Sequence, residues 1–368
     1  MPDKIKRIET YCVKLPYRGA IQFASAEDTG GPYVILRITT KDGVEGIAEC
    51  IARPQQFQGE DTRMIAYELD TFFRPMLEGA DPLEHGQILS GMARIKHCRA
   101  AKAMIDLALW DIKGKLLQQP VWRLLGGSSG KAVPLSTIVF GDTAKDMVKD
   151  AVKTVKEQGI KGFKIKVWKR SMEDVAVIRD IRKAVGDEAF LYADSNGVYG
   201  EGEARRIFPH FADSNVRFIE DPCKFNDPEQ LAKVAAVLPM PVLGDSPCES
   251  LEAVYALVKA GAIGAVSVKL RRTGLTESVK LVGLCEAAGI PAVIGTDTES
   301  RVGAQARLHL WAAFRSLQAI PAETGFFRHL ADDLFTGDFE FKNGAVSVSD
   351  APGFGAALDE KKLKKYLV

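Results

Sequence analysis

Two lysines stand one residue apart at the end of a short apolar segment, in Phe163-Lys164-Ile165-Lys166. Side chains two residues apart in a β-strand point to the same face, so both ammonium groups are predicted to lie on one side of the strand. A third lysine, Lys269, ends a later apolar segment. Nearby positive charge lowers the pKa of a lysine and makes it a usable base, so these three residues are candidate acid–base groups.

Carboxylates end three apolar segments that lie between these lysines in the chain: Asp194, Glu220 and Asp245. If the segments are neighbouring parallel strands, the three carboxylates converge, and converging carboxylates need a cation to stay ionised. Oxygen ligands suit Mg²⁺ or Mn²⁺ rather than zinc. A hard cation between lysines suits removal of a proton next to a carboxylate, because the cation stabilises the enediolate that forms.

The elements that must position these groups follow a regular rhythm after residue 130. Apolar segments alternate with helical stretches, and the strand candidates are 135–139, 162–167, 190–194, 217–220, 242–245, 265–269, 292–295 and 318–323. This pattern predicts an α/β fold, a modified TIM-type (β/α) barrel of seven to eight units, whose site lies at the C-terminal strand ends. A doubly wound sheet would need a glycine-rich phosphate loop after its first strand, and the sequence has none there.

The segments on either side of the barrel have a different pattern. Alternating apolar residues around Lys41-Asp42-Gly43 predict a β-hairpin, and residues 100–113 predict a helix. We therefore expect an α+β capping domain at 1–128, the catalytic barrel at 129–330 and a C-terminal tail at 331–368. A second predicted hairpin, over 338–348, indicates that the tail returns to the capping domain.

Further polar residues are candidates for substrate binding. They end barrel strands or lie in loops where a cap would close, and they are Asn196, Asp297, Glu299, Glu323, Phe23 and Arg53. Arg53 could pair with a second substrate carboxylate. Asp297 and Glu323 either contact substrate or form ion pairs with Arg271, Arg272 or Arg301.

The order of these motifs resembles the enolase superfamily, muconate-lactonizing subgroup. The resemblance rests on residues 42–49, Ala103–Lys115, Lys164-Ile165-Lys166, Asp194 with Asn196, Glu220 with Pro222, Asp245, Lys269, and Pro352-Gly353-Phe354-Gly355. It implies that Asp194, Glu220 and Asp245 bind Mg²⁺, that Lys166 and Lys269 oppose each other, and that Glu299 hydrogen-bonds near Lys269. The sequence departs from the family pattern at three places near the substrate: Asp245-Ser246-Pro247, Arg271-Arg272 and Asp297-Thr298-Glu299.

The resemblance implies an enzyme that acts on a small carboxylate. The leading interpretation is muconate cycloisomerase-like lactonization of a diacid. The alternatives are a racemase or epimerase of an amino-acid derivative or dipeptide, by two-base 1,1-proton transfer, and a dehydratase. A non-catalytic barrel protein would be expected to lack one of the three lysines or three carboxylates, and all six are present.

The composition excludes several other classes. The chain has 368 residues with 49 Lys+Arg and 48 Asp+Glu, so its net charge of +1 favours neither nucleic acid nor an anionic membrane as a partner. No apolar run reaches the ~18 residues of a membrane span, and the charged N-terminus predicts a cytoplasmic protein. The six cysteines form no CxxC pair and are expected to be free thiols. The family resemblance adds the expectation of a homo-oligomer.

Overall fold

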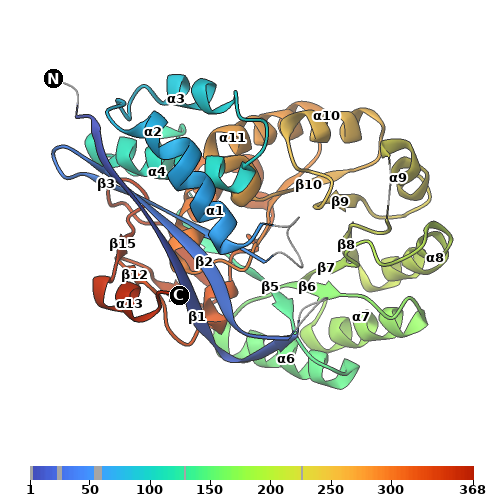
Figure 1. Ribbon diagram of the computed structural model, residues 1–368. Coiled ribbons are helices and arrows are strands. Elements are labelled where there is room, and N and C mark those ends of the chain that lie inside the picture. The colour runs from blue at the N-terminus through green and yellow to red at the C-terminus, as the bar shows by residue number, and fades with distance from the viewer. Residues whose placement is uncertain (1–2, 23–26, 54–59, 128–129, 225–226) are drawn as a thin grey trace.

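A computed structural model of the chain describes residues 3–22, 27–53, 60–127, 130–224 and 227–368 (Figure 1). Its N-terminal part contains an antiparallel sheet in the order β1 (Ile5–Gln22), β2 (Glu27–Thr40) and β3 (Glu45–Ile51). The predicted hairpin is confirmed, because β2 and β3 pair through seven consecutive residues. Gly43 has φ +86°, a left-handed conformation that glycine adopts without steric cost, and this permits the tight turn.

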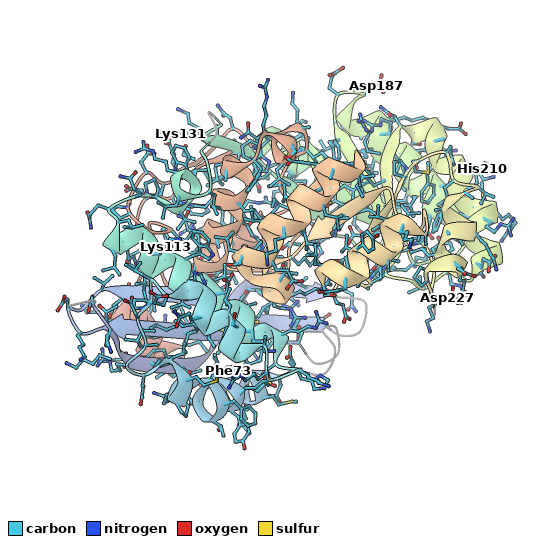
Figure 2. All side chains as sticks on the ribbon, turned by 90° about the horizontal axis from the view of Figure 1, so that it is seen from above. Phe73, Lys113, Lys131, Asp187, His210 and Asp227 are labelled. Atoms are coloured by element: carbon cyan, nitrogen blue, oxygen red, sulfur yellow. The ribbon has the colours of Figure 1, made fainter. Side chains whose placement is uncertain are left out.

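Helical segments follow the sheet. They are α1 (Thr62–Glu68), the π-helical turn η1 (Leu69–Phe73), α2 (Arg74–Leu77), α3 (His85–Met92), α4 (Arg99–Leu116) and α5 (Val121–Leu124). The predicted helix over 100–113 is therefore confirmed as part of α4. This helix lies so close to β3 that a Cβ on Gly46 would be 2.1 Å from the backbone oxygen of Ala108. Figure 2 shows Phe73 in this cap, at the opposite end of the molecule from His210 and Asp227.

Seven parallel strands form the catalytic sheet, in the order β11-β10-β9-β8-β7-β6-β5. The strands are β5 (Ser136–Val139), β6 (Gly162–Lys166), β7 (Phe190–Asp194), β8 (Val216–Glu220), β9 (Val242–Gly244), β10 (Ala265–Val268) and β11 (Ala292–Ile294). The helical segments between and after them are α6 (Ala144–Gln158), α7 (Met172–Val185), α8 (Glu201–Ile207), η2 (Phe208–Ser214), α9 (Pro228–Ala235), α10 (Leu251–Lys259), α11 (Leu270–Ala288) and α12 (Arg301–Ala313). Figure 1 shows the sheet curled with these helices outside it, as predicted for a modified TIM-type barrel.

The predicted eighth strand over 318–323 is wrong. Its first residues belong to the 3₁₀ helix η3 (Arg315–Ala319), and only an isolated bridge between Leu135 and Ala322 remains. Backbone hydrogen bonds still close the barrel, since Ala322 N donates to Pro134 O and Glu323 N donates to Ile294 O. The segment is too short for a ladder, but it joins the two edges of the sheet.

The interior of the barrel has two layers. One layer, on the side of the N-terminal strand ends, consists of apolar side chains: Tyr192, Phe218, Leu243, Ala265, Val293 and Ile320. Two residues further along these strands, the same inward face carries charged groups, for example Asp194 after Tyr192 and Glu220 after Phe218. The apolar layer therefore forms the floor of a charged site.

The C-terminal tail contacts both the barrel and the cap. The predicted hairpin is present as β13 (Phe341–Lys342) and β14 (Ala345–Ser347), but β14 pairs with β4 (Ala132–Pro134), beside the barrel rather than in the N-terminal sheet. The remaining elements are η4 (Phe326–His329), β12 (Phe335–Thr336), β15 (Ala357–Leu358) and α13 (Glu360–Lys365). The tail contacts the cap along its length, because Leu330 bridges to Tyr17, Gly353 to Pro120 and Leu367 to Val13, and Glu360 pairs with Arg37. No helix in the described part of the chain is long and apolar enough to cross a membrane.

Candidate active site

Lys164 is the most deeply placed of the three lysines. It points into the barrel from β6 and is 2% exposed. Its Nζ donates to Glu220 Oε1 at 2.9 Å and lies 2.9 Å from Glu323 Oε2 and 3.6 Å from Asp194 Oδ2. Three carboxylates therefore surround one ammonium group, and this arrangement fixes its position at the centre of the site.

Lys166 lies nearer the opening of the barrel, because its side chain is 20% exposed against 3% for Lys164. Its Nζ donates to Asp194 Oδ2 at 2.6 Å and to Asn196 Oδ1 at 2.7 Å. Asn196 has φ +47°, a conformation that asparagine adopts more readily than most residues, and its N–H donates to Asp194 Oδ1 at 2.8 Å. The candidate site residues Lys166, Asp194 and Asn196 thus lie in contact with one another.

The opposing side of the site contains Lys269 and Asp245, as predicted, and Arg272. Lys269 Nζ donates to Asp245 Oδ2 at 2.9 Å. Arg272 Nη1 lies 3.1 Å from Asp245 Oδ1 and also donates to the backbone oxygen of Asp245. Of the three arginines considered as partners of Asp297 or Glu323, Arg272 pairs with Asp245 instead, whereas Arg271 Nε lies 3.8 Å from Asp297 Oδ1.

A break in α11 positions Lys269 and Arg272. Gly274 has φ +59° and ψ −163°, which divides the helix into a first turn and a longer second part. Asp106 of α4 caps this second part, because its Oδ2 accepts from the N–H groups of Leu275 at 2.6 Å and Thr276 at 2.9 Å. The first turn, which follows β10 directly, is therefore not continuous with the rest of α11.

Asp221, which was not among the predicted site residues, supports the carboxylate layer. It accepts hydrogen bonds from the N–H groups of Asp245 at 3.0 Å and Ser246 at 2.9 Å, and from the Ser246 hydroxyl. Burial raises the pKa of Asp221 to about 6, and the charges of Asp245 and Asp194 add to the shift. Its place directly after Glu220 was the only signal for it in the sequence.

Asp297 and Glu299 both face Arg307, an arginine of α12 that the sequence did not suggest. Arg307 Nη2 donates to Asp297 Oδ2 at 2.6 Å, and Arg307 Nε lies 3.6 Å from Glu299 Oε2. The hydrogen bonds of the Glu299 carboxylate are with Thr296, the N–H of Asp297 and Thr324, not with Lys269. Asp297 and Glu299 are therefore both paired with groups of the protein.

The remaining predicted residues have different surroundings. Glu323 reaches the site through Lys164 and lines a small cavity together with Thr137, Thr296 and Phe326. Arg53 is 2% exposed and lies against Tyr17, with Asp28 at 3.6 Å, so its charge is already matched within the cap. Phe23 lies outside the described residues.

The cap holds the loop that carries Asp297 and Glu299. Tyr33 of β2 donates its hydroxyl to the backbone oxygen of Thr298 at 2.9 Å, and Thr298 has φ +71°, which is rare for a β-branched residue. Glu49 of β3 accepts from the N–H and the hydroxyl of Ser300, the residue that caps α12. Strained backbone of this kind persists where surrounding contacts fix it, as it does at many functional sites.

The pKa values of two site lysines are raised, whereas nearby positive charge was expected to lower a lysine pKa. Burial lowers the pKa of Lys164, but Glu220 and Glu323 outweigh it and raise that pKa well above its usual value. Burial likewise opposes the shift at Lys269, whose pKa is raised by Asp245 and Asp297. With the protein groups alone, both lysines are held protonated, so the expected lowering of a lysine pKa needs positive charge beyond these side chains.

The carboxylates of the site contact lysines and also have buried oxygens that a divalent cation could use. No group of three or more His, Cys, Asp or Glu side chains in the described part of the chain is already arranged to hold a metal ion, since lysines contact the carboxylates instead. Glu220 Oε2 and Asp245 Oδ1 are nevertheless buried without a hydrogen bond, although Lys164 and Arg272 lie within ion-pair distance of them. Buried oxygens that lack hydrogen bonds, on neighbouring strands, suit a hard cation.

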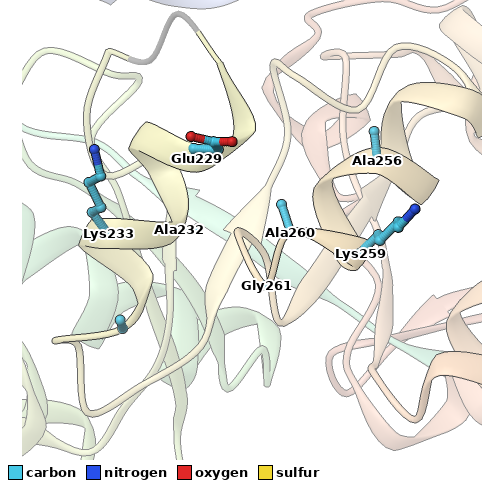
Figure 3. Close-up of a pocket in the computed structure, with 8 residues that line it drawn as sticks. Glu229, Ala232, Lys233, Ala256, Lys259, Ala260 and Gly261 are labelled. Carbon is cyan, nitrogen blue, oxygen red and sulfur yellow. The ribbon is translucent and has the colours of Figure 1, made fainter.

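A separate surface groove of about 710 Å³ lies between α9 and α10 (Figure 3). Four of its eight lining residues are alanines, and the charged ones are Glu229, Lys233 and Lys259. It contains none of the carboxylates or lysines described above, so we do not assign the chemistry to it.

Two family models and several known proteins match this chain. The model "Enolase C-terminal domain-like" matches residues 146–362, and "Mandelate racemase / muconate lactonizing enzyme, N-terminal domain" matches residues 7–126. The chain is 31% identical to chloromuconate cycloisomerase CbnB of Cupriavidus necator, over 99% of each chain. It is 26% identical to N-succinyl-L-Arg/Lys racemase of Bacillus cereus, over 99% of this chain and 98% of that protein.

A solved structure is similar over nearly its whole length. Muconate lactonizing enzyme from Mycobacterium smegmatis, complexed with muconolactone, superposes with a TM-score of 0.94 at 31% identity, covering 99% of this chain and 100% of that chain. Both domains of the family are matched, and the similarity extends across cap, barrel and tail. The chain therefore belongs to the mandelate racemase/muconate lactonizing enzyme family of the enolase superfamily.

Proposed function

We propose that this chain is a muconate cycloisomerase-like isomerase that interconverts a small unsaturated diacid and its lactone. The observation that carries the proposal is the placement of Lys166 on β6 and Lys269 after β10, on opposite sides of carboxylates from β7, β8 and β9. Positive groups on both sides of a substrate carboxylate favour chemistry at the carbon next to it.

Asp194, Glu220 and Asp245 would hold Mg²⁺, or Mn²⁺ in its place. When bound, the cation stabilises the negative charge of an enediolate and lowers the pKa of nearby ammonium groups. Asp221 would keep Asp245 and Ser246 in position through the three hydrogen bonds that it accepts from them. Arg272 would restrain the other side of the Asp245 carboxylate.

The proton transfer is assigned to Lys166. In the lactone-forming direction, an oxygen of one substrate carboxylate adds to the carbon–carbon double bond, and negative charge builds up next to the other carboxylate. The Lys166 ammonium then gives its proton to the carbon adjacent to that carboxylate, and in the reverse direction the neutral amine removes it. Lys269 would serve as the opposing electrostatic group.

Racemisation or epimerisation of an amino-acid derivative is the second candidate, and a dehydratase would use the same groups. The racemase named among the relatives supports it, as does the presence of a lysine on each side of the site. Lys166 and Lys269 would then alternate as base and acid. Asn196 and Glu323, which contact the two lysines of β6, are the substrate-binding candidates in either case.

The test is a substrate panel followed by proton NMR in D₂O with Mg²⁺. The panel contains muconates, N-acyl amino acids, dipeptides and sugar acids. Lactone formed from a muconate supports the cycloisomerase proposal. Deuterium exchange at the α-carbon of an amino-acid derivative, without reaction of any muconate, replaces it with the racemase.

A further inference from the structure

Trp168 differs from the other three tryptophans of the chain in both packing and hydrogen bonding. The other three pack in the large hydrophobic cluster, and each donates its indole N–H to a protein oxygen: Trp110 to Thr276 Oγ1 at 2.9 Å, Trp122 to Ser349 O at 3.3 Å and Trp311 to Ile320 O at 3.1 Å. Trp168 belongs to none of the hydrophobic clusters of the described residues. Its Nε1 is buried and has no hydrogen-bond acceptor in that part of the chain. Since a buried indole N–H usually has an acceptor, this exception requires an explanation.

Trp168 lies at the mouth of the site, two residues after Lys166. Strand β6 ends at Lys166, but its pairing with β7 continues for one residue, since the Val167 N–H donates to Asp194 O at 3.0 Å. Val167 is completely buried, in the same cluster as Ile165, the preceding outward-facing residue. Strand alternation therefore places Trp168 on the inner side with Lys166, about 7 Å closer to the opening. The residue is half-buried, so a substrate that enters the site can reach it.

The loop that carries Trp168 is fixed by two contacts to its surroundings. The buried carboxylate of Asp174, at the start of α7, accepts hydrogen bonds from the Arg170 N–H at 3.1 Å and from the Tyr199 hydroxyl. The Arg170 side chain donates two further hydrogen bonds, each of 2.9 Å, to the Glu203 carboxylate of α8. A donor that is already held in place binds its acceptor at a smaller cost in conformational entropy.

We infer that Trp168 is a specificity-determining residue, whose indole N–H donates a hydrogen bond to the substrate carboxylate that forms the lactone. This inference rests on the proposed function, in which the substrate is a diacid. Arg53, the residue expected to bind a second carboxylate, is buried against Tyr17 and lies 3.6 Å from Asp28, so its charge is already matched. The lactone keeps a carbonyl oxygen at this end, so the same hydrogen bond persists from substrate to product.

Steady-state kinetics of a Trp168→Phe variant with cis,cis-muconate and Mg²⁺ test the hydrogen bond, because phenylalanine keeps an aromatic ring but has no N–H. A bond made equally in the ground state and the transition state affects KM and not kcat. We expect KM to rise about tenfold, as for loss of one hydrogen bond to a charged acceptor, with kcat within about twofold of the wild type. Trp122→Phe is the matched control: it removes an N–H that is bonded within the protein, outside the site, and should leave KM unchanged.

Nitrogen-15 NMR of the indole groups tests the contact directly and separates it from the proposed reaction. The four tryptophans give four indole signals, and the signal missing from folded Trp168→Phe belongs to Trp168. Each compound of the substrate panel is added with Mg²⁺, and muconate is expected to shift the Trp168 signal alone. If an N-acyl amino acid reacts instead and shifts that signal, the proposed reaction fails but Trp168 is supported as a substrate donor. The inference is overturned by a reacting compound that leaves the signal unmoved, by a panel in which no compound moves it, or by a wild-type KM in Trp168→Phe.

Discussion

Replacing Gly274 by alanine should disrupt the break in α11 that positions Lys269 and Arg272. A Cβ at this position would lie 2.5 Å from Asp106 Oδ2, and the backbone angles of φ +59° and ψ −163° are nearly exclusive to glycine. The strain costs about 1–3 kcal/mol, and displacing Asp106 weakens hydrogen bonds to Leu275 and Thr276 worth about 1.5–3 kcal/mol each. We expect a net loss of roughly 4 kcal/mol in the free energy of unfolding.

The assay is thermal melting together with steady-state kinetics. With an unfolding entropy of about 2.1 cal/mol/K per residue, that loss lowers the melting temperature by about 5 °C. The value of kcat should fall about tenfold or more, because the turn after Lys269 moves. Gly283→Ala is the control, since Gly283 is exposed on the same helix and a Cβ there meets nothing within 4 Å. A Gly274→Ala variant that melts and turns over like Gly283→Ala would refute the reasoning.

Three further substitutions probe other parts of the site. Glu220→Gln should weaken Mg²⁺ binding, measured by calorimetry, by at least about tenfold, because one anionic ligand is lost. Tyr33→Phe should lower the free energy of unfolding by about 1–2 kcal/mol, measured by denaturant titration, since the Thr298 carbonyl loses its donor. Burial raises the pKa of Glu49 from 4.5 to about 8, so the folded chain binds more protons than the unfolded chain between these values. Stability attributable to Glu49 therefore falls by about 1.4 kcal/mol per unit as pH rises through this window, and Glu49→Gln should remove that slope in melts across pH.

The charged layer of the site could be predicted because it depends on local periodicity. Strand alternation places Lys164 and Lys166 on one face, and parallel strands place their C-terminal residues at one edge, so Asp194 and Glu220 fall in register. Both properties can be read within a few residues of each motif. The barrel itself follows from the same alternation of short apolar segments and helices, repeated along the chain.

The parts that failed depend on contacts between distant segments. The segment 318–323 has strand-like composition, yet tertiary packing leaves it as a 3₁₀ turn and one bridge. Nothing near Asp297 in the sequence indicates that Arg307, one helix later, would pair with it. The raised pKa values of Lys164 and Lys269 depend first on Glu220 and Asp245 and then on Glu323 and Asp297, which lie in distant segments of the chain. The domain boundaries at 128 and 330 remain predictions.

The role of Lys166 in proton transfer is the central claim, and one comparison tests it most directly. Lys166→Ala, Lys269→Ala and Lys161→Ala would be assayed with Mg²⁺ in D₂O by proton NMR on the substrate that the panel identifies. Lys161 is an exposed lysine just before β6 and serves as the control. We predict that Lys166→Ala abolishes both turnover and deuterium incorporation next to the carboxylate, whereas Lys161→Ala matches the wild type. A folded Lys166→Ala variant that still incorporates deuterium at the wild-type rate would contradict the account.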